Sequence, residues 1–247
     1  MAGELTSTSG VTNAGTITLN GTGTHAVATI ENAEGGSFTA AGTVDTNSLV
    51  NSGTVSAADL TADAITNSKG SITASGTLTT TGTITNDAQF KVEGTGTHTV
   101  GTLDNNASAT FESAGTLSAG VVTNDGTLTA ADLTVTTSIA NNGALTSSGT
   151  ADLNNFSQTA SGTAGFGSVT FKGQSGESGF NGSVTSTGDI TFAAGSVYTG
   201  SAVVNAGGAL NVEGTLTAGS LASTGAATIN GTASAGCGDL GAPPIGA

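Results

Sequence analysis

The sequence predicts an all-β protein that folds as a parallel β-solenoid of about twelve coils, with a repeat of about 19 residues. Three observations lead to this prediction. A triplet of an aliphatic residue, a variable residue and Asn recurs along the chain at nearly constant spacing. Short stretches of alternating apolar and polar residues, the period of a strand with one buried face, lie between these triplets. Gly and Asn interrupt the stretches, as expected at tight turns.

The repeat is clearest at residues 65–121, which divide into three blocks of 19 residues that each open with the triplet. Along the chain the steps between triplets are 19, 19, 16, 19, 19, 19 and 17 residues, for triplets that begin at Val11, Ile30, Leu49, Ile65, Ile84, Leu103, Val122 and Ile139. We expect the aliphatic residues to stack as a buried column and the Asn side chains to form a hydrogen-bonded ladder at a corner of the coil. The predicted ladder consists of Asn13, Asn32, Asn51, Asn67, Asn86, Asn105, Asn124, Asn141 and Asn205.

A second corner is predicted eight to ten residues after the Asn, where pairs such as Gly42-Thr43 and Gly149-Thr150 occur. Three short strands per coil fit this spacing. In the coils whose step shortens to 16 or 17 residues, Ala-Asp-Leu at 58–60 and at 131–133 replaces the Gly-Thr pair. We therefore expect a turn to absorb the shortening while the buried positions stay in register.

One solenoid domain is predicted over residues 1–235, with irregular coils at 156–202, where Gly residues crowd together. Residues 236–247 contain both prolines and read as a Gly/Pro tail or linker. The single cysteine, Cys237, excludes an internal disulfide framework.

Composition and charge narrow the range of partners. The chain carries 40 Gly, only 8% charged residues and a formal charge of −14, with three Lys and no Arg. Nucleic acid and anionic membranes bind proteins mainly through cationic side chains, so we expect neither nucleic-acid binding nor membrane insertion. The first ten residues, MAGELTSTSG, lack the basic and apolar regions of a signal peptide, so export would require a signal outside this segment.

Units such as VTNDGTLTAADL and IANNGALTSSGT resemble the repeats of filamentous-haemagglutinin-type adhesins and of autotransporter passenger regions in Gram-negative bacteria. The resemblance extends from about Val11 to Ala233. It implies a right-handed parallel β-helix that is exported to the cell surface and serves in adhesion or as a stalk. Neither an N-terminal secretion domain nor a C-terminal membrane barrel is recognisable in the sequence, so the resemblance leaves the export route open.

These observations predict a non-enzymatic structural or adhesive rod located outside the cell or at its surface. Candidate partners are a host-cell, matrix or carbohydrate surface, and further copies of the chain, because a solenoid exposes an unpaired strand edge at each end. We predict no catalytic residue, no cofactor and no metal site. The Gly-Gly-x-Gly-x-Asp repeat of calcium-binding β-rolls does not occur in the sequence.

Two alternative functions use other residues. Thr77-Leu78-Thr79, Thr97-His98-Thr99 and Thr127-Leu128-Thr129 are similar to the Thr rows of ice-binding β-solenoids, although Thr43-Val44-Asp45 breaks the second row. A polysaccharide-degrading β-helix enzyme would need grouped carboxylates, but the Asp residues fall at differing offsets from the coil Asn.

Both histidines occur in near copies of one segment, GTGTHAVATIEN and GTGTHTVGTLDN, 73 residues apart. This separation equals four coils and places His25 and His98 in one column about 19 Å apart, too far to share a metal ion. We expect both to be packed or corner residues.

Overall fold

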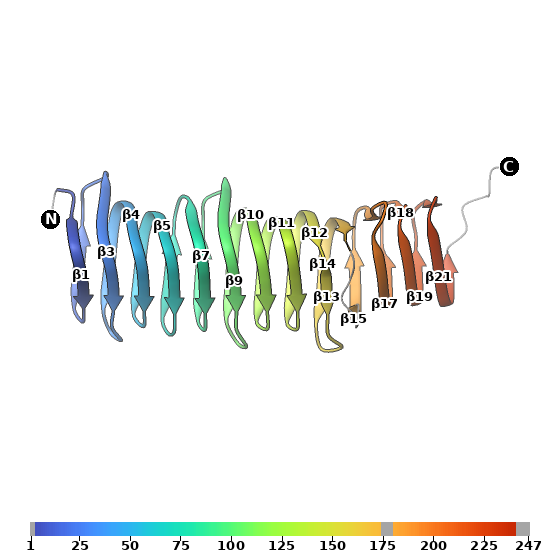
Figure 1. Cartoon of the computed structure of the whole chain (residues 1–247), viewed down its shortest axis with the longest axis horizontal. Helices are drawn as coiled ribbons and strands as arrows, with labels where there is room; N and C mark the ends of the chain where they lie inside the picture. Colours follow the sequence, from blue (N-terminus) through green and yellow to red (C-terminus); the bar gives the residue numbers. More distant parts are fainter. Residues whose placement is uncertain (1–2, 174–179, 241–247) are drawn as a thin grey trace. The chain divides into compact units, whose positions relative to one another are not determined.

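A computed structural model describes residues 3–173 and 180–240 of the chain. These residues form a parallel β-solenoid of about 12 turns, with repeats about 18 residues apart, and they contain no helix (Figure 1). The predicted all-β solenoid fold is therefore confirmed. The described residues divide into two compact units. Unit 1 comprises the residues up to 121 together with 125–130, and unit 2 comprises 122–124 together with the residues from 131 onward.

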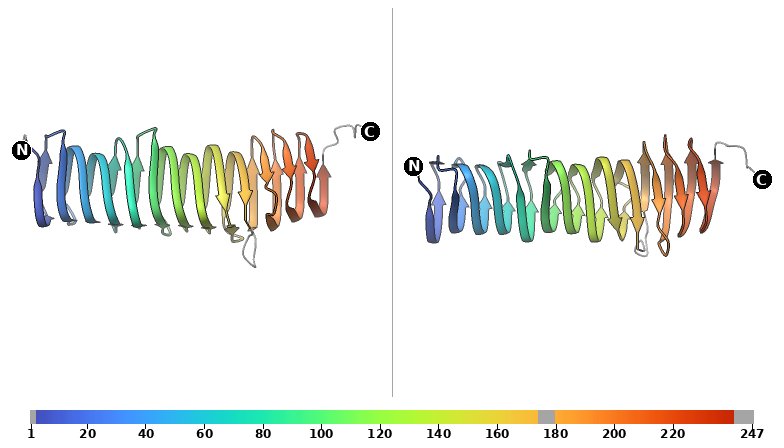
Figure 2. Two further views of the ribbon diagram at one scale, coloured as in Figure 1. Left: turned by 45° about the horizontal axis from the view of Figure 1, so that its top comes forward. Right: turned by 90° about the horizontal axis from the view of Figure 1, so that it is seen from above.

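Unit 1 contains nine complete strands and parts of two more within the described residues. In Figure 2, these strands lie side by side in successive coils. They are β1 (Thr6–Asn13), β2 (Thr16–Leu19), β3 (Thr24–Asn32), β4 (Ser37–Asn51), β5 (Thr54–Asn67), β6 (Ser71–Ala74), β7 (Leu78–Asn86), β8 (Gln89–Val92) and β9 (Thr97–Asn105), with parts of β10 (Thr110–Asn124) and β11 (Thr127–Asn141).

Unit 2 contains the remainder of β10 and β11 and ten further strands in its described part. They are β12 (Ala144–Asn154), β13 (Phe156–Gln158), β14 (Thr163–Lys172), β15 (Phe180–Ser186), β16 (Ile190–Phe192), β17 (Val197–Asn205), β18 (Leu210–Val212), β19 (Thr215–Ser223), β20 (Ala227–Ile229) and β21 (Thr232–Leu240).

Each coil has three short segments, which can run together into one long strand. The pairing of β4 with β5 shows the pattern, because its register breaks into three blocks that begin at Ser37, Thr43 and Ser48. We call these the first, middle and last segments, and the ladder Asn ends the last segment. Side chains alternate between inside and outside along each segment, as the periodicity of the sequence predicts.

The short coil between Asn51 and Asn67 loses its residues at both corners. The register pairs Ser37 with Thr54 and Thr43 with Asp59, so one residue replaces two at the second corner, and the turn after the ladder Asn is two residues shorter. All buried positions keep their partners. The predicted preservation of register is confirmed, but most of the shortening lies at the Asn corner and not at the Ala-Asp-Leu corner.

The core of unit 1 is built from columns of inward side chains. The aliphatic column predicted from the triplets is present, since Ile30 pairs with Leu49, Leu49 with Ile65, Ile65 with Ile84 and Ile84 with Leu103. These side chains are at most 1% exposed. Burying a side chain of this size contributes about 1.5–3 kcal/mol, so the stability of the unit is spread over many coils.

Unit 2 has an aromatic core instead of a purely aliphatic one. Phe156, Phe171, Phe180, Phe192 and Tyr198 are all fully buried, with neighbouring ring centroids 5.1–6.1 Å apart. The Tyr198 hydroxyl donates a 2.6 Å hydrogen bond to the backbone carbonyl oxygen of Lys172. Burial raises the pKa of Tyr198 to about 12, so the phenol stays neutral and serves as a structural hydrogen-bond donor.

β21 ends at Leu240, so the strand includes residues 236–240 of the segment expected to form a tail. The rest of that segment, with Pro243 and Pro244, lies outside the described residues. Among the described residues, no helix is both long and apolar enough to cross a membrane.

One inward column of unit 1 contains a matched pair of threonines. Thr46 and Thr80 both pair with Ala62 and are at most 4% exposed. The Thr46 hydroxyl donates to the carbonyl oxygens of Ala28 and Ser48, whereas the Thr80 hydroxyl has no hydrogen-bond partner.

We expect Thr80→Val to raise the free energy of unfolding by about 1 kcal/mol, because it removes an unsatisfied buried hydroxyl at nearly constant volume. Thr46→Val should lower it by a similar amount. Urea unfolding followed by circular dichroism measures both changes. A destabilised Thr80→Val variant would contradict the assignment of that hydroxyl as unsatisfied.

Candidate functional site

The most regular polar feature of unit 1 is a ladder of buried Asn side chains at one corner of the coils. Each side-chain amide nitrogen donates to the side-chain oxygen of the Asn in the next coil over 2.8–2.9 Å. The run consists of Asn13, Asn32, Asn51, Asn67, Asn86 and Asn105, all at most 4% exposed.

Asn is suited to this corner because it has two donors and two acceptor sites. The second N–H of Asn86 donates to the carbonyl oxygen of Thr110, the first residue of β10, at 3.0 Å. Its Oδ1 accepts the N–H of Ala88 in its own turn at 3.4 Å, besides the amide of Asn67. The side chain thus closes its own turn and is joined to the turn that follows Asn105.

Unit 2 contains a similar ladder, in which Gln158 follows two Asn residues. Asn124 donates to Asn141 at 2.8 Å, and Asn141 donates to the side-chain oxygen of Gln158 at 2.9 Å. The Gln158 amide then donates to the carbonyl oxygen of Ser183. Gln158 was not predicted. Its signal in the sequence is Phe156-Ser157-Gln158, an apolar-x-amide triplet that begins 17 residues after Ile139.

The register does not place Asn205 in the ladder column. That column continues from Gln158 to Phe180 and Gly200, whereas Asn205 pairs with Ser186 and Ser223 on another segment. Asn205 instead stabilises its local turn, accepting the N–H groups of Gly207 and Gly208. An apolar-x-polar triplet fits the end of any inward-facing segment, so the triplet alone does not identify the corner.

Two aspartates brace the second corner in the shortened coils. Asp59 accepts the backbone N–H of Thr77 at 2.6 Å and its hydroxyl at 2.8 Å, and Asp132 holds Thr150 in the same way at 2.7 and 2.9 Å. The backbone and then the hydroxyl hydrogen bond lower the pKa of both carboxyl groups below the ordinary value of 3.8. The neighbouring Gly76 is required because an added Cβ would lie 2.4 Å from the Asp59 carboxylate.

Both histidines are fully buried and brace corners. Nε2 of His25 faces the carbonyl oxygen of Gly21 at 3.0 Å, and Nδ1 accepts the N–H of Leu5 at 3.1 Å. His98 repeats the arrangement with Gly94 at 2.7 Å and Leu78 at 3.3 Å. A nitrogen that faces a carbonyl must donate, so both rings have the Nε2–H tautomer. Both ring nitrogens are therefore used in local hydrogen bonds.

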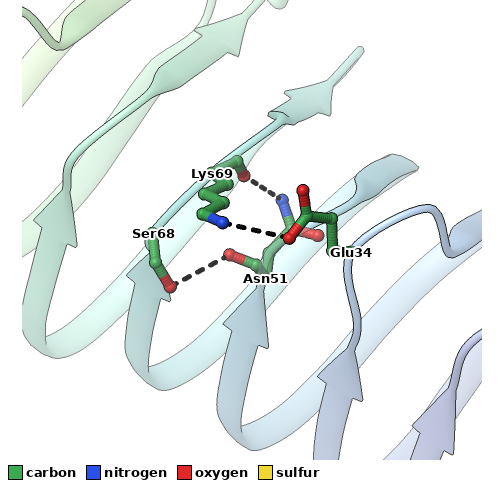
Figure 3. Close-up of polar contacts among 4 residues, drawn as sticks. All are labelled: Glu34, Asn51, Ser68 and Lys69. Atoms are coloured by element: carbon green, nitrogen blue, oxygen red, sulfur yellow. Dashed lines mark hydrogen bonds and ion pairs between the residues drawn. The ribbon is translucent and has the colours of Figure 1, made fainter.

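Every lysine of the chain is paired with an acidic side chain. Lys69 reaches Glu34 at 3.0 Å, while its backbone carbonyl accepts from Asn51 (Figure 3). Lys91 pairs with Glu93 at 2.8 Å, and Lys172 pairs with Asp152 at 2.5 Å. These pairs are exposed and contribute little to stability, but they leave the outer surface without an unpaired lysine.

Acidic side chains are dispersed over the surface. Within residues 3–173 and 180–240, no group of three or more His, Cys, Asp or Glu lies close enough to hold a metal ion. The carboxylates of Asp59 and Asp132 serve as corner braces.

The threonine triplets noted in the sequence lie on two different segments. Leu78 and Thr79 pair with Leu60 and Thr61 of the middle segment, whereas Thr127 receives the amide of Asn105 and so begins a first segment. A more regular hydroxyl array occurs on the first segments of unit 1. Its register-paired outward residues are Thr16, Ser37, Thr54 and Ser71 in one row and Thr18, Thr39, Ser56 and Thr73 in the other.

Comparisons of the chain with protein families, with curated proteins and with solved structures found no match.

We expect Asn86→Ala to lower the free energy of unfolding by at least about 2 kcal/mol, because the substitution removes the acceptor of the buried Asn67 amide and the amide that donates to the Thr110 carbonyl oxygen. Asn47→Ala, at an exposed position of β4, provides the control and should change it by less than about 0.5 kcal/mol. Chemical unfolding of both variants measures the difference. Equal effects would contradict the structural role of the ladder.

Acid should weaken the Asp59 brace. Because the folded-state pKa is lowered, its contribution to stability is present above the unfolded-state value of about 3.9 and is lost as the pH falls through the folded-state value. Asp59→Asn should therefore lower the melting temperature near neutral pH, with the difference from the native chain shrinking as the pH falls below about 3.9 and through the folded-state value. Thr77→Val, which keeps the backbone donor, should have a smaller effect. A difference that is constant with pH would contradict the role of the charge.

Proposed function

We propose that this chain is a structural and adhesive segment of an extracellular or cell-surface protein and that it has no catalytic activity. The observation that carries the proposal is that the inward residues of the coils repeat from coil to coil, whereas the outward residues vary. Inward positions repeat apolar and amide side chains and use their hydrogen bonds for stacking. Outward positions in register with one another vary, as where Ser71 pairs with Gln89 and Thr73 with Lys91.

We call the outward face of the stacked segments the outer wall. Its backbone is regular and its side chains vary, so it is suited to binding a partner over a wide area. Such a wall need not contain a reaction centre, and a partner can contact many coils at once. The resemblance of the repeats to those of secreted adhesins supports the same role. A host-cell, matrix or carbohydrate surface is the partner that we propose.

The charge of the outer surface restricts that partner. Three lysines are paired with acidic groups, and the chain has a formal charge of −14. Anionic polymers would be repelled by such a surface. The proposed partner is therefore neutral or carries positive charge.

Self-association is part of the proposal. In the described residues, β1 has its register with β3, and β21 has its register with β19. The opposite edge of each strand can pair with a strand from another copy or from a flanking segment. Sedimentation at rising concentration distinguishes association from a persistent monomer.

Ice binding is a second candidate, favoured by the hydroxyl array on the first segments of unit 1. Its two rows lie about 6.7 Å apart along the strand, and its members lie about 4.8 Å apart between coils. The array ends where Gln89 and Lys91 replace the hydroxyl residues. Thermal hysteresis in a solution of the chain would favour this candidate over adhesion.

Adhesion is tested by adding the fluorescently labelled chain to host cells, matrix proteins and immobilised polysaccharides. We expect saturable binding that disappears when the chain is unfolded before it is added, because recognition depends on the stacked wall. Binding no greater than that of the unfolded chain would overturn the proposal. Release of sugars from polyuronate or glucan substrates would favour the enzyme alternative instead.

A further inference from the structure

The outer wall of unit 2 contains a notch of about 360 Å³ between two rows of hydroxyl side chains. Gly165 of β14 lies in the middle, and the register pairs it with Thr146 on one side and Thr185 on the other. Both threonines are exposed and lie two coils apart, or about 9.6 Å. The notch exists because the coil between them has no side chain at this position.

Gly165 is exceptional among the strand glycines. For every other strand glycine from Gly10 to Gly236, an added Cβ would lie within 3.1 Å of another atom, so close approach explains the absence of a side chain. Gly167, two residues further along the same strand, belongs to this group because its Cβ would lie 2.3 Å from the carbonyl oxygen of Ser148. A Cβ at Gly165 would meet no atom within 4 Å, and its φ angle is not in the left-handed region.

The fold therefore gives no reason for glycine at position 165. Glycine inside a strand weakens it, and an outward position on a strand would ordinarily favour a residue such as Thr. A glycine of this kind often marks a place where a ligand approaches the backbone closely. The register-paired threonines provide hydroxyl groups at both sides of that place.

We propose that the notch binds one ring of a neutral carbohydrate. Its lining includes no charged side chain, which excludes ion pairing as the basis of recognition. The rim provides the hydroxyls of Thr146, Ser148 and Thr185, while the floor is mainly apolar and lies over the backbone of Gly165 and the buried Phe166. A sugar ring has the matching chemistry, with hydroxyls around its edge and C–H groups on its face. The volume is near the lower end of the range for small-ligand sites, about 300–1,000 Å³.

This inference rests on the proposed adhesive function and names the ligand class for one part of the wall. The experiment applies the labelled full chain to a printed array of neutral and acidic oligosaccharides and then measures the affinity for the best neutral binder by calorimetry. We expect the native chain to bind neutral sugars. Gly165→Thr should weaken that affinity at least about tenfold, because the new side chain occupies the space of the ring.

The same variant should fold as well as the native chain or better, since the added side chain meets open space and improves the strand propensity. Its melting temperature therefore separates loss of the site from loss of the fold. Ala144→Thr adds a threonine to the same wall at a position that pairs with Thr163, outside the notch, and should leave the affinity unchanged.

Unchanged sugar affinity in a folded Gly165→Thr variant would overturn the notch as the site, as would a native chain that binds no neutral sugar on the array. Either result would leave the adhesive proposal standing if the chain still binds cells or matrix proteins. Failure to bind any of these surfaces would remove the adhesive proposal itself.

Discussion

The ladder of buried amides is the constraint on which the remaining features of the coils depend. A corner that turns the chain inside a stack must satisfy backbone groups that no strand pairs, and leaving a buried group unpaired costs about 1–3 kcal/mol. Asn86 meets this requirement in its own turn through Ala88 and in the turn that follows Asn105 through Thr110. The same side chain therefore fixes both the geometry of the corner and the stacking of the coils. This explains why the period is nearly constant although the outward residues vary.

At the second corner, other side chains supply hydrogen bonds. Asp59 and Asp132 extend to the Thr of the following corner, and the two His rings connect long corners to the preceding coil. The Asp and His side chains that the sequence offers as candidate catalytic or metal-binding groups are thus hydrogen-bonded within the fold. The outward residues can vary without disturbing the stack.

The sequence predicts the stack well because its signals are local and repeated. Asn13 to Asn105 in unit 1, and Asn124 with Asn141 in unit 2, occur at one phase of the repeat, so the column within each unit follows from spacing alone. Gln158 occupies the ladder position but is not an Asn, so the Asn pattern does not include it. Asn205 fits the pattern but lies on another segment, since the irregular coils before it change which segment the triplet ends. The Gly165 notch could not be predicted, because the sequence does not distinguish a glycine required by a neighbouring backbone from one beside open space.

The direction of the amide ladder gives unit 1 a polarity. From Asn13 to Asn105, each side chain donates to the next and accepts from the one before, so the amide dipoles all point the same way and reinforce one another. At the start of the run, Asn13 donates to Asn32, and its Oδ1 accepts the N–H of Gly15 in its own turn. A coil that extended the ladder before Asn13 would have to supply a donor to this oxygen. Two copies that met at their Asn13 ends would bring acceptors against acceptors, so extension of the ladder at this end has only one possible direction.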